Sequence, residues 1–109
     1  MEIRNGTSVV IVFALVDATD DETSETGISS ITAQISKNGG SFAAVTNAVS
    51  EIGNGWYKVT LTTTETNTDG PLIFRAIATG TDEWRDVHEV KTYMLTTLET
   101  HRIIDILFR

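Results

Sequence analysis

The chain has no cysteine, only one proline and few basic residues. Without cysteine it can form neither a disulfide framework nor a thiolate zinc site, and thiol chemistry is excluded. Its 8 Lys and Arg residues face 15 Asp and Glu residues, so the formal net charge is -7. Because DNA and RNA attract basic surfaces, we expect no nucleic-acid partner.

Long apolar runs are also missing. The longest, Val9 to Val16, is far shorter than the roughly 20 residues of a membrane-spanning helix, so we expect no membrane partner. It is not typical of a signal-peptide core, because Glu2 interrupts a basic leading region and no Ala-x-Ala site follows. Its β-branched residues predict a strand that is apolar on both faces and covered on both sides.

What the chain does contain is strand alternation around tight turns. Asn54 and Gly55 both tolerate positive φ, as a two-residue hairpin turn requires. After this turn, Tyr57, Val59 and Leu61 fall on one face of a predicted strand, and polar residues fall on the other. This pattern indicates a strand with one buried face.

Similar patterns predict further strands over Ile28 to Lys37, Leu72 to Thr79 and Asp86 to Leu95. Ser41 to Ile52 adds one or two more, with Phe42 in the core, whereas Met1 to Gly6 is predicted to be a loop and Pro71 to close another. About seven short strands at this spacing predict an all-β fold. We expect one domain, an immunoglobulin-like antiparallel β-sandwich over residues 1–95.

The last residues form a separate apolar segment, 96–109. Thr96 and Glu99 have the spacing of a capping box, which favours a short helix, although alternation leaves a strand open. A helix this short must pack on the domain or on a partner subunit. The residues predicted to make that contact are Leu98, Ile103, Ile104, Leu107 and Phe108.

Two tryptophans are further candidates for contact. Trp84 is expected at the tip of a loop, where it either meets a partner or folds back over the edge of the sandwich. Trp56 directly follows the turn at Asn54, and core packing and exposure are equally compatible with that position. If exposed, Trp56 and Trp84 would offer flat surfaces on which sugar rings can stack.

The titratable residues predict no active site. Asp17, Asp20, Asp21 and Glu22 could donate oxygens to calcium, but their spacing is not that of an EF-hand, and a solvated loop is expected. The two histidines, His88 and His101, are expected to be partly exposed and not to bind metal. No nucleophile motif or paired carboxylates stand out, so we expect neither an enzyme nor a cofactor.

Two runs, Ile35 to Phe42 and Val49 to Thr62, resemble a β-sandwich module that recurs in bacteriophage virion proteins. Leu15-Val16-Asp17 and Thr26-Gly27-Ile28 extend the resemblance over about Ile3 to Glu89. It implies a structural component of a virion head, neck, tail or baseplate that binds itself and other virion proteins as a homo-oligomer. The alternative is a carbohydrate-binding or receptor-contacting module that uses Trp56 and Trp84.

Overall fold

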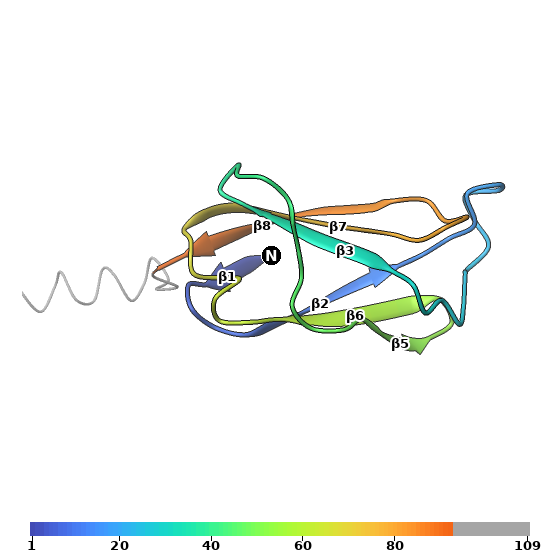
Figure 1. Ribbon diagram of the computed structural model, residues 1–109, viewed down its shortest axis with the longest axis horizontal. Coiled ribbons are helices and arrows are strands. Elements are labelled where there is room, and N and C mark those ends of the chain that lie inside the picture. The colour runs from blue at the N-terminus through green and yellow to red at the C-terminus, as the bar shows by residue number, and fades with distance from the viewer. Residues whose placement is uncertain (93–109) are drawn as a thin grey trace, which may run out of the picture.

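The computed structural model describes residues 1–92, which contain strands and no helix (Figure 1). Five strands form one sheet in the order β1-β8-β7-β3-β4, and three form a second sheet in the order β2-β6-β5. This part of the chain is all-β, as predicted. The strands are β1 (Glu2–Arg4), β2 (Val9–Ala14), β3 (Thr32–Lys37), β4 (Ala43–Ala44), β5 (Ser50–Gly53), β6 (Trp56–Leu61), β7 (Gly70–Ile77) and β8 (Trp84–Lys91).

The two sheets lie one above the other in Figure 1 and share one hydrophobic core. The ring centroid of Phe13 in β2 lies 5.8 Å from that of Tyr57 in β6 and 5.3 Å from that of Phe74 in β7. All three rings are fully buried. Because buried aromatic side chains dominate core energetics, the contact of Phe13 with Phe74 is a principal link between the sheets.

The predicted alternation is confirmed in the strands that carry it clearly. The buried residues are Tyr57, Val59 and Leu61 in β6, Leu72, Phe74 and Ala76 in β7, and Ala33 and Ile35 in β3. Asn54 and Gly55 have φ angles of 55° and 82°, as the predicted turn between β5 and β6 requires.

The first apolar run forms the predicted strand, but the prediction that neighbours cover it on both sides is wrong. β2 lies at an edge of the three-stranded sheet instead of between neighbours. Val10 and Val12 are 48% and 46% exposed, whereas Ile11 and Phe13 are buried. Because apolar residues occupy both faces of this strand, its sequence contains no alternation from which the exposed face could be recognised.

The first residues are not the predicted loop. Glu2–Arg4 forms β1, which pairs in parallel with β8 and buries Ile3 opposite Val90. The five-stranded sheet is therefore mixed and not purely antiparallel, and residues 1–92 contain eight strands where about seven were predicted. One apolar residue between two charged ones is too short a pattern to predict a strand.

Two smaller predictions are also wrong. Phe42 is 45% exposed instead of belonging to the core. Pro71 lies within β7, opposite Glu89, and not in a loop. It is the second residue of the strand, where the first ladder bonds are only beginning and a missing N–H is tolerated.

The segment predicted over residues 96–109, and the domain boundary at residue 95, lie outside the described residues. The contact residues predicted there, Leu98, Ile103, Ile104, Leu107 and Phe108, stay predictions. Within residues 1–92, no helix has the length and apolar character needed to cross a membrane.

Replacing Phe74 with alanine tests the link between the sheets. We expect Phe74→Ala to lower the free energy of unfolding by about 3–5 kcal/mol, because it removes a buried ring and leaves a cavity against Phe13. Urea denaturation followed by tryptophan fluorescence measures this loss. In the control, Phe42→Ala removes the same ring from a half-exposed position and should cost about 1 kcal/mol or less. Equal losses in the two variants would contradict this core.

Candidate functional site

The two tryptophans face different ways. Trp84 is the first residue of β8 and is partly buried against the core, so it does not lie at the tip of a loop as predicted. Its ladder pairing with Ala76 of β7 holds it in the sheet. Trp56 is 47% exposed, on the outward side of β6 in the other sheet. The two indole rings therefore do not form a common stacking surface.

Trp56 belongs to a largely apolar surface that we call the β2/β6 outer face. Pairing of the two strands sets Val12 opposite Lys58 and Ala14 opposite Trp56. The outward-facing residues of these strands are Val10, Val12, Ala14, Trp56, Lys58 and Thr60. Among them Lys58 is the one charged residue, and no carboxylate is present.

This composition contrasts with that of the whole protein, whose formal net charge is -7. Ile52 of the neighbouring strand β5 is also exposed, by 56%. Neighbouring exposed apolar side chains mark contact sites more often than single ones do. The sequence did not indicate this surface, because Val10 and Val12 were assigned to a fully covered strand.

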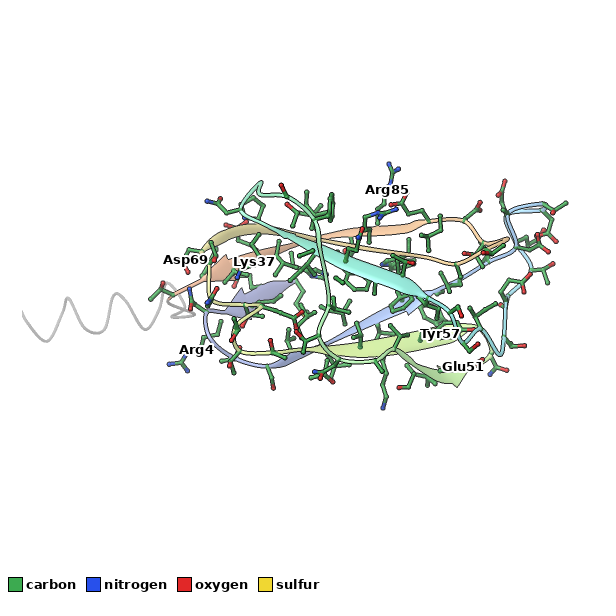
Figure 2. The ribbon with its side chains drawn as sticks, viewed as in Figure 1. Arg4, Lys37, Glu51, Tyr57, Asp69 and Arg85 are labelled. Atoms are coloured by element: carbon green, nitrogen blue, oxygen red, sulfur yellow. The ribbon has the colours of Figure 1, made fainter. Side chains whose placement is uncertain are left out.

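A second candidate site is a shallow depression of about 460 Å³ on the outer side of the five-stranded sheet. It is lined by Phe42, Ile73, Arg75, Glu83 and Arg85, and Figure 2 shows Arg85 extending from this side of the sheet. Glu83 accepts hydrogen bonds from Arg75 and, at 3.0 Å, from Arg85. The guanidinium carbon of Arg75 lies 5.8 Å from the ring centroid of Phe42.

These contacts determine the chemistry of the depression. Hydrogen bonds from Arg75 and Arg85 hold the pKa of the Glu83 carboxyl below its usual range. A carboxylate kept ionised in this way accepts hydrogen bonds but does not donate a proton near neutral pH. The depression is therefore suited to polar contacts and not to general acid catalysis by Glu83. Its one sequence signal is the pair of opposite charges, Arg75 and Glu83, on either side of the turn from β7 to β8.

The acidic loop, residues 17–27, lies at the right end of the molecule in Figure 1. Hydrogen bonds from the side chain and backbone of Thr23 lower the pKa of Asp20. By contrast, a hydrogen bond with the Asp21 carboxyl, burial and nearby carboxylates raise the pKa of Asp82. Among residues 1–92, no group of three or more His, Asp or Glu side chains is arranged to hold a metal ion. The carboxylates of Asp21 and Asp82 therefore repel each other when both are ionised.

His88 is buried and not partly exposed as predicted. Its Nε2 lies 2.9 Å from Oδ2 of Asp86 on the same strand. Burial lowers the pKa of His88, while the charge of Asp86 opposes this shift. The other histidine, His101, lies outside the described residues.

No family model and no curated protein matches this chain.

The carboxylate repulsion predicts a stabilising substitution. Asp21→Asn removes a negative charge beside Asp82, and asparagine tolerates the φ of 57° at this position. A raised carboxyl pKa in the folded state means that repulsion destabilises the fold once the pH exceeds that pKa. We expect Asp21→Asn to raise Tm at pH 7, and the gain to shrink as the pH falls toward 4 and carboxyls become protonated.

The matched control is Asp69→Asn. Hydrogen bonds from Thr92 and Asn5 lower the pKa of Asp69, so the ionised form is stabilised in the fold. That stability is present at neutral pH and is lost as the pH falls through the lowered pKa. Asp69→Asn should therefore lower Tm at pH 7. Thermal unfolding across pH measures both variants. Tm shifts of the same sign in the two variants would contradict the assignment of repulsion to Asp21 and of stabilising hydrogen bonds to Asp69.

Proposed function

We propose that this chain is an immunoglobulin-like sandwich module of a bacteriophage virion and acts through protein–protein contacts in a head, neck, tail or baseplate. The observation that carries this proposal is the β2/β6 outer face, an exposed apolar surface without carboxylates on a protein whose net charge is -7. Such a surface is suited to lasting contact with another protein. The virion assignment itself comes from the resemblance of Ile35 to Phe42 and Val49 to Thr62 to the phage module.

The strand order supports the immunoglobulin-like part of the proposal. In such sandwiches one sheet contains strands A, B, E and D, and the other contains C, F and G, with C′ added in variable-type domains. The order β2-β6-β5 corresponds to B-E-D, and β8-β7-β3-β4 corresponds to G-F-C-C′. In this correspondence β1 is a short first strand that lies beside G.

The core supports the same correspondence. Antibody domains join strands B and F by a disulfide that crosses the core. Here the corresponding strands, β2 and β7, are joined by the contact between Phe13 and Phe74, with ring centroids 5.3 Å apart. Ile35, which pairs with Phe74 in the ladder, lies on the strand that holds the core tryptophan in antibody domains. Aromatic packing can therefore take the place of the missing cysteines.

The composition of purified virions tests the proposed function. We expect mass spectrometry of particles, banded from a culture that produces this chain, to recover it in a fixed ratio to the major coat protein across preparations. A soluble host protein of similar abundance in the lysate serves as the control and should be lost during purification. Recovery of the chain in the lysate but not in the particles would contradict a structural role in the virion.

The alternative, a carbohydrate-binding or receptor-contacting module, is favoured by one observation, the half-exposed ring of Trp56 on an open sheet face. If it holds, a glycan array identifies a ligand and Trp56→Ala abolishes binding, because the stacking surface is removed. Phe42→Ala, which removes an exposed ring from the other sheet, should leave binding unchanged. No glycan bound, or binding unaffected by Trp56→Ala, would exclude this alternative.

A further inference from the structure

The edges of the two sheets differ in how they are protected from pairing with another chain. The edge strands are β1 and β4 in one sheet and β2 and β5 in the other. Proteins protect exposed edges by keeping the strands short, by placing charges on them, or by introducing bulges. β1 has three residues, two of them charged, β4 has two residues, and β5 has an irregular register between Glu51 and Gly53.

β2 has none of these protections. It is six residues long, its sequence is VVIVFA, and it contains no charge, proline or glycine. Its register with β6 runs without interruption from Val9 opposite Leu61 to Ala14 opposite Trp56. A long, regular, apolar edge strand is a template for adding another strand.

The hydrogen-bonding groups of this edge can be assigned from the register. The amide of Leu15 donates to the carbonyl of Gly55 at 3.1 Å, on the side of β6. Backbone groups of successive residues alternate in direction, so those of Val10, Val12 and Ala14 point away from β6. Within residues 1–92, no strand pairs with this side of β2. Beyond the end of β2, the carbonyl of Val16 on this side accepts a hydrogen bond from the amide of Asp82 at 3.0 Å.

We propose that β2 pairs antiparallel with β2 of a second copy of this chain, with the two-fold axis at Val12. In this register Val12 is opposite Val12 of the second copy, and Val10 is opposite Ala14. Each of these is a hydrogen-bonded pair, in which the two residues exchange both N–H···O bonds. The two three-stranded sheets become one continuous sheet, and the apolar side chains of the two edges meet on its outer face.

A second copy is the partner that this edge fits best. The strand is self-complementary about Val12, as a two-fold interface requires. The β2/β6 outer face contains no carboxylate, so two copies meet without bringing acidic groups together. The charged side chains of this face are those of the two copies of Lys58, whose strands lie three strand spacings, about 14 Å, apart. That separation exceeds the Debye length of about 8 Å at physiological salt.

This pairing names the partner and the surface for the assembly function proposed above. Its biological use rests on that proposed function. Since each copy has a net charge of -7, long-range repulsion opposes the encounter. We therefore expect dimerisation to strengthen as salt rises from low to physiological concentration.

The absence of cysteine from the chain allows a direct test by cross-linking. In a hydrogen-bonded antiparallel pair the Cα atoms are about 5.5 Å apart, which is within the range that a disulfide spans. Val12→Cys in the full chain should form a covalent dimer under mild oxidation, seen on non-reducing gels. The matched control, Thr60→Cys, places the thiol on the same face but one strand from the edge, and should not cross-link.

Sedimentation equilibrium of the full chain measures the interface without cross-linking. We expect a dimer at micromolar concentration, and Val12→Lys should raise its Kd about tenfold or more, because two ammonium groups would meet at the axis. Thr60→Lys adds the same charge away from the axis and should leave Kd nearly unchanged. Circular dichroism checks that both variants remain folded.

The outcomes separate this pairing from the proposed function. A wild-type chain that stays monomeric, or an oligomer that Val12→Lys and Thr60→Lys affect equally, would overturn the β2 interface. A Val12→Cys chain that forms no covalent dimer would also overturn this interface, and would indicate that residues 93–109 or a different protein cover the edge. A chain that is present in purified virions but lacks this dimer would retain its structural role and lose only the β2 pairing.

Discussion

Phe13 occupies the position on which the arrangement of the two sheets depends. Its ring lies against Tyr57 within its own sheet and against Phe74 across the core. Because side chains alternate along a strand, burying Phe13 also buries Ile11 and turns Val10 and Val12 outward. The packing of one ring thus determines which face of β2 meets the solvent, and it creates the surface to which we assign the function.

Tyr57, which packs against Phe13, also holds the loop between β2 and β3 through its hydroxyl group. Its hydroxyl donates to the carbonyl of Glu25 at 2.7 Å and accepts from the amide of Ile28 at 3.2 Å, and Figure 2 shows it near the start of β6. The carboxylate of Glu51 accepts a hydrogen bond from the amide of Gly27 at 2.8 Å. The core residue and the neighbouring strand β5 therefore hold the chain between β2 and β3 in place, although that chain has little regular structure.

The candidate surface was harder to predict than the fold. The strands β6 and β7 alternate clearly, and their buried faces were predicted correctly. β2 is apolar throughout, so its pattern indicates a strand but not which face is covered or that it lies at an edge. Phe42 comes to lie beside Arg75 only when β4, β3 and β7 pair, and no local pattern marks this long-range contact.

By itself the sequence determined local conformation and charge. The turn at Asn54-Gly55, the alternation in β6, the missing cysteines and the acidic loop all follow from residue chemistry over a few positions. The tertiary structure alone decided which strands became edges, that β1 pairs with β8, and that Val10 and Val12 are exposed. The physical reason is that exposure depends on neighbours supplied by distant parts of the chain, and a strand with two apolar faces is equally compatible with a covered or an open position.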